Sequence, residues 1–301
     1  MPTDGLYYST GAMTDLLHDP RFPRSNSYNP QWITENCYGA HPLWLTEWLC
    51  QHLELQPGMR VLDLGCGRAK SSVFLAREVG VQVWATDLWT SASENHQRVV
   101  DANVQDRVFP IHADARQLPF ARDFFDAVLC VDSYNYLGTD DLYLNYLAQF
   151  IRPGGVFAFV SAGLTQEFGA DVPEHLRRFW TQDAWTIHTA AWWRHHVERT
   201  GLVAIEHAGD VPDGWRMWRE WADATEAAGW YREMLEADAG RYLGYVGLTS
   251  KRIAGRPLAE YAWPSTLRSL PVQYERHPLT HPANRAILGV RIAAQGFQRS
   301  R

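Results

Sequence analysis

Val61-Leu62-Asp63-Leu64-Gly65-Cys66-Gly67 is the stretch of this 301-residue chain that decides its fold. The apolar run over 60–64 predicts a buried strand, and the two glycines predict a tight turn into a helix over 70–79. Glycines in such a turn let the backbone approach a ligand closely, and the following helix offers its first N–H groups to that ligand. Several nucleotide-cofactor folds share this turn, so the rest of the sequence has to distinguish between them.

Short apolar runs alternate with amphipathic stretches on both sides of this turn. Further strands are predicted over 82–86, 108–112, 125–131 and 156–160, and helices over about 91–103 and 140–150. An earlier helix begins at His41 and is stopped by Gln56-Pro57-Gly58. Continuous apolar strands separated by helices indicate a parallel sheet that is covered on both faces. The predicted fold class is therefore α/β, with a Rossmann-like doubly wound sheet.

The chain changes character after residue 161. A helix is predicted over 189–200, and two late strands are predicted over 202–207 and 243–249. The N-terminal segment 1–40, which appears irregular in sequence, and insertions at about 163–187 and 211–240 would form a lid over a domain spanning 41–254. Residues 255–301 form a C-terminal extension with weak periodicity, to which the sequence assigns no role.

Tryptophans are concentrated in the second half of the chain. Nine of the 14 follow residue 179, namely Trp180, Trp185, Trp192, Trp193, Trp215, Trp218, Trp221, Trp230 and Trp263. A core that uses large aromatic side chains explains this bias as well as a pocket does. Aromatic pocket walls would suit an apolar, planar or cationic ligand. Both interpretations are open at the level of sequence.

Three aspartates follow three consecutive predicted strands. Asp63 lies near the end of the first, Asp87 follows the second 24 residues later, and Asp114 comes just after the third. A lone aspartate in such a place is most often a helix cap or a turn residue. Three of them at the carboxyl edge of one parallel sheet instead indicate a ligand site at that edge.

With these acids, the sequence resembles the class I S-adenosylmethionine-dependent methyltransferases that act on small molecules. The resemblance rests on the glycine turn, the three acids, Asp114-Ala115-Arg116-Gln117-Leu118-Pro119-Phe120, Phe125-Asp126-Ala127-Val128 and Arg152-Pro153-Gly154-Gly155. It covers about residues 41–160 by motif and 189–250 by topology only. It implies a seven-stranded sheet whose last strand is antiparallel. Ala69 departs from the family pattern, which commonly has a third glycine there, and alanine fits if its φ is negative.

The resemblance implies S-adenosylmethionine as the cofactor. Asp63 would face the positively charged amino-acid end of the cofactor, since the same carboxylate would repel a pyrophosphate. Asp87 would accept from the ribose hydroxyls, and Asp114 would accept from the adenine amino group. The full set of predicted cofactor-binding residues is Asp63, Gly65, Cys66, Gly67, Asp87, Leu88, Asp114, Ala115 and Asp132, with Tyr28 and Trp32 of the N-terminal segment.

Methyl transfer from a sulfonium is an in-line displacement with a neutral leaving group, so the enzyme mainly aligns the reactants and excludes water. A base is needed only when the acceptor must lose a proton. Tyr134, just after the fourth strand, and His188, on the predicted lid, are the candidate catalytic residues. No metal site is predicted, because the histidines lack the spacing and the carboxylates of one.

Charge and composition narrow the substrate class and the location. The formal net charge of −6 and the lack of a basic stripe argue against a nucleic-acid substrate. The sequence has no run of about 18 apolar residues, so no membrane span is predicted. Scattered cysteines favour reduced thiols in a cytoplasm. We therefore expect a cytoplasmic enzyme with a small-molecule substrate and no membrane partner, and the sequence leaves a homo-oligomer open.

Three alternatives remain open. A nicotinamide-dependent oxidoreductase shares the turn, although a third glycine and a catalytic Tyr–Lys pair are not evident. An S-adenosylmethionine-dependent C-methylation coupled to cyclisation or cyclopropanation would suit an aromatic-rich second half. A non-catalytic cofactor-binding protein is the third alternative, and the retention of all three acids and the glycines argues against it.

Overall fold

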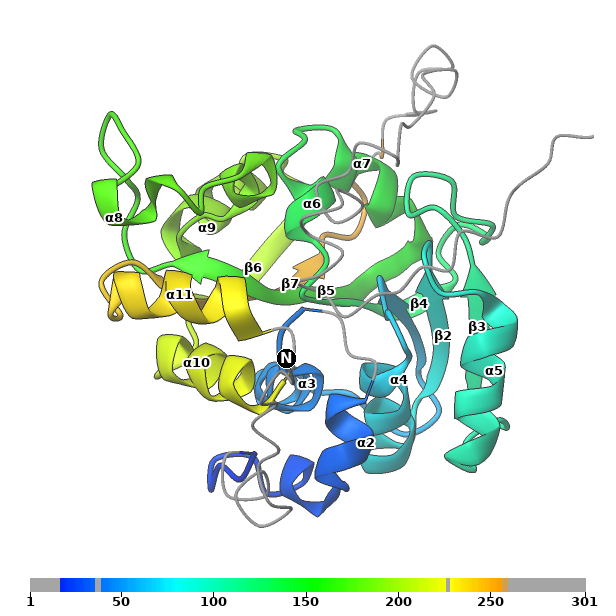
Figure 1. The fold of residues 1–301 in the computed structure, drawn as a ribbon. Coiled ribbons are helices and arrows are strands. Elements are labelled where there is room, and N and C mark those ends of the chain that lie inside the picture. Colours follow the sequence, from blue (N-terminus) through cyan, green and yellow to red (C-terminus); the bar gives the residue numbers. More distant parts are fainter. Residues whose placement is uncertain (1–16, 36–38, 226–227, 257, 259–301) are drawn as a thin grey trace, which may run out of the picture.

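A seven-stranded sheet with the order β3-β2-β1-β4-β5-β7-β6 forms the centre of the molecule (Figure 1). The computed structural model describes residues 17–35, 39–225, 228–256 and 258. The strands are β1 (Arg60–Leu64), β2 (Gln82–Asp87), β3 (Val108–His112), β4 (Phe125–Val131), β5 (Ile151–Leu164), β6 (Val203–Asp210) and β7 (Leu243–Arg252). β1 to β5 run parallel, and β7 pairs antiparallel with both β5 and β6. The predicted α/β sheet with an antiparallel last strand is confirmed.

Strands β1, β3 and β4 have the predicted bounds, but β5 is much longer than the predicted 156–160. It extends to Leu164 because β7 pairs with it all the way from Val156. Arg152-Pro153-Gly154-Gly155, which follows the helix predicted over 140–150, lies within the strand, next to a register shift between Phe125 and Ala127 of β4. β5 therefore reaches past the end of β4, toward the region of the predicted lid.

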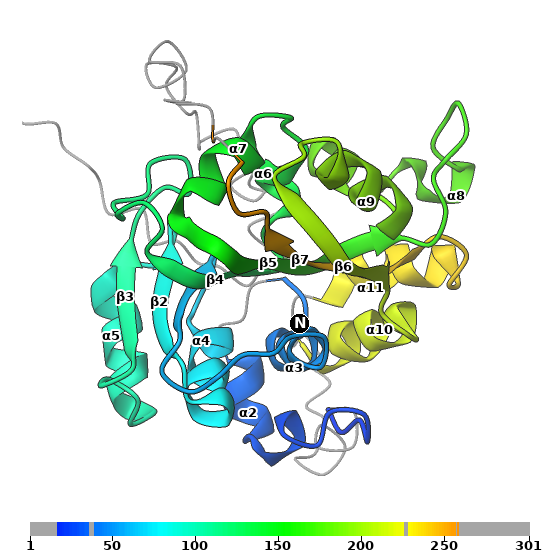
Figure 2. The same ribbon diagram turned by 180° about the vertical axis from the view of Figure 1, so that it is seen from behind.

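Helices cover both faces of the sheet, as the apolar strands predict (Figures 1 and 2). The helical elements are η1 (Ser25–Ser27), α2 (Pro30–Thr34), α3 (Pro42–Cys50), α4 (Lys70–Phe74), its π-helical continuation η2 (Leu75–Val79), α5 (Ala92–Asp101), α6 (Asn135–Gly138), α7 (Tyr143–Leu147), η3 (Ala148–Phe150), α8 (Glu174–Arg177), η4 (Gln182–Thr186), α9 (Ala190–Glu198), α10 (Gly214–Ala224) and α11 (Ala228–Asp238). Alternate side chains of β1 point to opposite faces: Val61 belongs to the core with α3, α4 and α10, and Leu62 to the core with α7 and α9. The helix predicted over 140–150 begins only at Tyr143, and α6 was not predicted.

Residues 17–35, the main described part of the N-terminal segment, are part of the core, although the sequence predicted an irregular covering segment. Phe22 and Ile33 are fully buried. Glu47 on α3 holds the segment in place, because its carboxylate accepts from the Ser25 N–H at 2.8 Å, from the Ser25 hydroxyl at 2.6 Å and from the Arg24 N–H at 3.1 Å. The buried carboxylate thereby fixes where α2 lies against the domain.

The predicted insertions each contain helices. Residues 163–187 contain α8 and η4, and residues 211–240 contain α10 and α11. The predicted C-terminal extension, 255–301, lies outside the described residues except for 255, 256 and 258. In the part of the chain that the structure describes, each helix is too short or too polar to cross a bilayer.

Candidate active site

The glycine turn between β1 and α4 closes against the ends of the neighbouring strands. The N–H groups of Gly65 and Cys66 donate to the carbonyl of Thr86 at 2.8 and 3.1 Å. Gly65 has a φ of +76°, and a Cβ at this position would lie 2.5 Å from the Cβ of Ser133. Glycine fits there because it tolerates a positive φ and leaves room for Ser133. The turn therefore contacts the segment that follows β4.

Ala69, which departs from the family pattern, has a φ of +57°. The expectation of a negative φ is therefore wrong. Ala69 is fully buried and precedes the first residue of α4. A left-handed alanine costs about 1–2 kcal/mol, so the turn keeps the backbone shape that a third glycine would allow at the expense of local strain.

Asp63 is fully buried beneath the start of α4. Its Oδ2 accepts from the hydroxyls of Ser71 and Ser72, both at 2.6 Å. Burial raises its pKa to about 6, although both hydroxyl bonds act in the opposite direction. Its Oδ1 is buried and has no hydrogen-bond partner among the described residues. The predicted cofactor acid thus anchors the helix and keeps one oxygen unsatisfied.

Asp87, at the end of β2, binds the glycine turn directly. Its Oδ2 accepts from the Gly67 N–H at 2.9 Å, and its Oδ1 accepts from the N–H groups of Trp89 and Thr90, both at 2.8 Å. Burial raises the pKa of this carboxyl against the three bonds. The next residue, Leu88, accepts from His112 Nε2 through its carbonyl, at 2.8 Å. Asp87 therefore connects the ends of β1 and β2.

Cys66 is buried under the same turn, and burial raises the pKa of its thiol. Asn95 on α5 contacts its Sγ at 3.7 Å and donates to the Gly67 carbonyl at 2.9 Å. These contacts attach the turn to α5, so Cys66 has a packing role in this structure.

Asp114, the third acid, forms a two-pronged ion pair with Arg116. Nε of Arg116 lies 3.0 Å from Oδ1, and an Nη lies 2.7 Å from Oδ2. The neighbouring Ala115 accepts from the Tyr143 hydroxyl through its carbonyl, at 3.1 Å. The loop after β3 is thereby fixed at the same carboxyl edge as Asp63 and Asp87.

The two N-terminal residues predicted to cover the cofactor, Tyr28 and Trp32, lie side by side, with their rings stacked at 5.5 Å between centroids. Trp32 lies beside the start of α4, where its carbonyl accepts from Lys70 Nζ and its ring lies 4.5 Å from the same nitrogen. Tyr28 donates to Glu78 Oε1 at 2.9 Å. Glu78 is eight residues beyond Lys70, which is about 12 Å along a helix. The hydroxyl of Tyr28 is therefore directed toward the far end of this helix while its ring lies against Trp32, and its contact with the cofactor remains a prediction.

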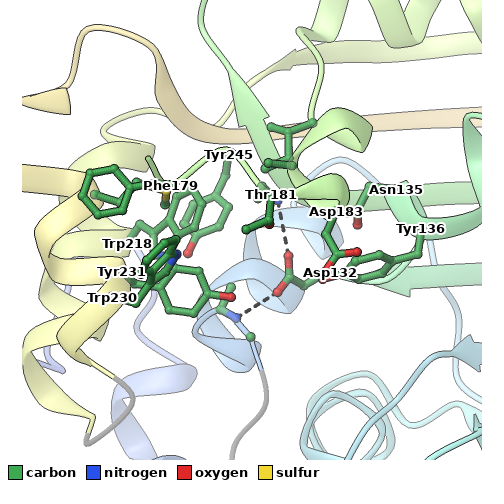
Figure 3. Close-up of a pocket in the computed structure, with 16 residues that line it drawn as sticks. Asp132, Asn135, Tyr136, Phe179, Thr181, Asp183, Trp218, Trp230, Tyr231 and Tyr245 are labelled. Carbon is green, nitrogen blue, oxygen red and sulfur yellow. Dashed lines mark hydrogen bonds between the residues drawn. The ribbon is translucent and has the colours of Figure 1, made fainter. Parts of the chain in front are cut away.

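A cavity of about 110 Å³ opens beside the carboxyl end of β4 (Figure 3). Asp132 forms part of its wall with a φ of +55°. Its Oδ2 accepts from the Ala40 N–H at 2.9 Å, and its Oδ1 accepts from the Ala162 N–H at 3.3 Å. Burial raises the pKa of Asp132 to about 6 against these bonds. Six aromatic side chains also line the cavity: Tyr136, Phe179, Trp218, Trp230, Tyr231 and Tyr245.

Neither predicted catalytic residue lines this cavity. Tyr134 is buried in the core on the α7 and α9 face, with its ring stacked on Phe159 at 4.8 Å between centroids. His188 stacks on Trp192 at 3.8 Å, and its Nδ1 lies 3.3 Å from Glu167 Oε2. Both side chains occupy packing positions here, so their predicted action on the acceptor is not supported.

The tryptophan bias predicted the cavity only in part. Of the nine late tryptophans, Trp218 and Trp230 line it. Trp193 is buried in the core and Trp185 is 61% exposed, whereas Trp263 lies outside the described residues. The aromatic bias was therefore a mixed signal, produced by core residues and cavity residues together.

Known methyltransferases resemble this chain in sequence, which agrees with the prediction of a cofactor site at the carboxyl edge of the sheet. Residues 61–155 match the family described as "Methyltransferase domain". The chain is 35% identical over 146 residues to methyltransferase GfsG from Streptomyces halstedii, a match that covers 48% of this chain and 50% of that protein. It is 27% identical over 227 residues to 27-O-demethylrifamycin SV methyltransferase from Amycolatopsis mediterranei, covering 69% and 82%. The match to GfsG thus spans about half the length of that curated relative.

The fold also resembles that of solved methyltransferases. Geranyl diphosphate C-methyltransferase from Streptomyces coelicolor A3(2) superposes with a TM-score of 0.58 at 20% identity, covering 69% of this chain and 78% of that one. At this identity the likeness concerns the fold alone. The domain match over 61–155, the strand order and the glycine turn agree with one another. Residues 61–155 therefore match a methyltransferase domain, on a sheet with the fold of the solved methyltransferases.

Proposed function

We propose that this protein transfers the methyl group of S-adenosylmethionine to a small molecule bound in the cavity beside β4. The observation that carries the proposal is that the segment after β4 contacts the glycine turn with one residue and lines the cavity with the residue before it. Gly65 packs on Ser133, and the preceding Asp132 lines the cavity. A cofactor held by the turn would face an acceptor across the end of β4, which is the alignment that an in-line transfer needs.

The carboxyl edge has the groups to hold this cofactor. The unsatisfied Oδ1 of Asp63 offers an acceptor to the positively charged amino-acid end, directly or through water. A carboxylate has about four acceptor positions, and Asp87 uses three of them on N–H groups, which leaves one for a ribose hydroxyl. Asp114 and Ala115 would border the adenine, and Trp32 would cover the site from the N-terminal side.

The bound cofactor would supply a methyl group on a positively charged sulfur. The aromatic side chains of the cavity would exclude water and fix the orientation of the acceptor. An acceptor that must lose a proton would meet the Asp132 carboxylate, which is mostly ionised above a pH of about 6. We therefore propose Asp132, in place of Tyr134 and His188, as the proton-accepting residue.

A small-molecule acceptor also agrees with the relatives and the charge. The names of the relatives describe transfer to a rifamycin precursor and to geranyl diphosphate. The sequence has no basic stripe that would hold a nucleic acid. Cys50, Cys66 and Cys130 are free thiols, a state that favours a reducing cytoplasm.

Asp87→Ala tests the cofactor assignment. We expect its affinity for S-adenosylhomocysteine, measured by calorimetry, to fall by roughly 1.5–3 kcal/mol, because charge-assisted bonds to the ribose are lost. Asp106→Ala is the matched control, since Asp106 is 68% exposed and precedes the opposite end of β3. Equal affinities in Asp87→Ala, Asp106→Ala and the unaltered protein would contradict the assignment.

A further inference from the structure

The charged side chains that line the cavity all have one sign. Among the described residues that line the cavity, Asp132 and Asp183 are the carboxylic acids, and none is a lysine, arginine or histidine. Figure 3 shows the two carboxylates on one side of the cavity, close to the ring of Tyr136. A phosphate or carboxylate bound here would face the carboxylates of Asp132 and Asp183, with no cation among the described lining residues, which is unfavourable in a partly buried site.

The opposite wall is aromatic. Trp218 lies on α10, Trp230 and Tyr231 lie on α11, and Tyr245 lies on β7. In Figure 3 these rings gather opposite Asp132, and the hydroxyl of Tyr231 points toward that carboxylate. Trp218 and Tyr245 stack on each other with centroids 5.4 Å apart. The faces of such rings attract cations, so the aromatic wall favours a positively charged ligand, as the carboxylates do.

Two buried polar atoms of the cavity lining are available to form hydrogen bonds with a ligand. Oδ1 of Asn135 and the hydroxyl of Tyr245 have no hydrogen-bond partner in the part of the chain that the structure describes. Asn135 is 4% exposed and Tyr245 is 2% exposed, so bulk water does not satisfy them. Burying such atoms without a hydrogen bond is unfavourable, so a ligand that pairs with them gains affinity. Asp132 also has about two acceptor positions left after its bonds to Ala40 and Ala162.

We infer that the methyl acceptor is a small amine, bound as its ammonium ion between the Asp132 and Asp183 carboxylates and the aromatic wall, and methylated on nitrogen. An ammonium supplies the N–H donors that Asp132 and Asn135 lack, and its positive charge complements both walls. The inference rests on the proposed function, because it names the substrate class of the same cavity.

The transfer balances as follows for a primary amine. The ammonium nitrogen first loses one proton, to Asp132 or through it to water, because a fully protonated nitrogen has no lone pair. That lone pair forms the new N–C bond to the methyl carbon while the C–S bond breaks and its electron pair remains on sulfur. The products are an N-methylated ammonium ion, S-adenosylhomocysteine and one released proton.

Three phenyl probes of similar size test the inference on the full chain saturated with S-adenosylhomocysteine. They are 2-phenylethylamine, which is a cation at neutral pH, 2-phenylethanol, which is neutral, and 3-phenylpropionate, which is an anion. We expect calorimetry to show the amine binding about tenfold more tightly than the alcohol, the contribution of one charge-assisted contact. The anion should show no saturable binding. Equal binding of all three, or preference for the anion, would overturn the inference.

Two variants, Asp132→Asn and Asp183→Asn, test whether these carboxylates are responsible for the tighter binding of the amine. Asp106→Asn is a matched control outside the cavity. Each cavity variant should lower the affinity for 2-phenylethylamine by about tenfold, while Asp106→Asn should leave it unchanged. The affinity for S-adenosylhomocysteine is measured on every variant. A parallel loss of both ligands in both cavity variants would mean that these carboxylates serve the cofactor, and it would overturn the inference.

The two proposals fail in different ways. If S-adenosylhomocysteine does not bind the unaltered protein, the proposed function fails, whatever the probes do. If S-adenosylhomocysteine binds and the amine has no advantage, only the amine assignment fails. Should Asp132→Asn not fold, Asp183→Asn on η4 decides alone, because Asp183 is on a separate element from the glycine turn.

Discussion

Gly65→Ala is expected to weaken binding of S-adenosylhomocysteine about 100-fold or more, because displacement of a ligand-binding group by about 1 Å has effects of that size. The added Cβ would lie 2.5 Å from the Cβ and 2.8 Å from the Oγ of Ser133. The variant must also adopt a φ of +76°. These two effects together should lower the free energy of unfolding by about 2–4 kcal/mol. Calorimetry and urea unfolding measure the two quantities separately.

Gly58→Ala provides the matched control. Gly58 has a φ of +83°, but a Cβ there would meet no atom within 4 Å. This variant should therefore lose only about 1–2 kcal/mol of stability, from the left-handed backbone, and keep its affinity for the cofactor product. If Gly65→Ala and Gly58→Ala behave alike, the close contact between the turn and Ser133 has no functional importance.

Asp63→Asn is expected to have opposite effects on stability and binding. Burial raises the pKa of Asp63 in the folded chain from 3.8 to about 6. The folded state therefore binds this proton more tightly than the unfolded state, and stability falls as pH rises from about 4 to about 6, by about 3 kcal/mol in total. An asparagine does not ionise, so Asp63→Asn should be more stable than the unaltered protein at pH 8, by up to about 3 kcal/mol. Its affinity for S-adenosylhomocysteine should fall about tenfold or more, because the acceptor charge is lost.

Asp126→Asn should show the opposite dependence of stability on pH, because it removes a carboxylate that stabilises the folded chain at neutral pH. The carboxylate of Asp126 accepts from the Arg60 N–H and from Arg152 Nε, both at 2.7 Å. These bonds lower its pKa in spite of partial burial. Its contribution to stability is therefore present at neutral pH and is lost as pH falls below about 4. Urea unfolding of both variants between about pH 3 and pH 8 checks the signs, and a loss of stability in Asp63→Asn at pH 8 would contradict the assignment of a raised pKa to Asp63.

The parallel part of the sheet was predictable because its signal is local. The parallel strands have short apolar runs, and those of β1, β2 and β4 end at an acid or a glycine at the carboxyl edge. The bounds of β1, β3 and β4 follow from those runs alone. The length of β5 does not, because its second half is stabilised by pairing with β7, some 85 residues later in the sequence.

The lining of the cavity was not predictable because it depends on the direction of single side chains. Tyr134 has helical backbone angles at the start of α6, and residues two apart on a helix point about 200° apart. Tyr134 therefore enters the core while Tyr136 lines the cavity. The motif identified the segment but did not distinguish Tyr136, which lines the cavity, from Tyr134, which is buried in the core. Likewise, the sequence did not distinguish Trp218 and Trp230 from the tryptophans of the core.

Calorimetry of the full chain with S-adenosylhomocysteine and, separately, with a nicotinamide dinucleotide tests the central claim most directly. The carboxyl edge presents carboxylates to the ligand, and a pyrophosphate would be repelled where an amino-acid end would be attracted. We predict saturable binding of S-adenosylhomocysteine at one molecule per chain and no binding of the dinucleotide. Binding of the dinucleotide without binding of S-adenosylhomocysteine would contradict it.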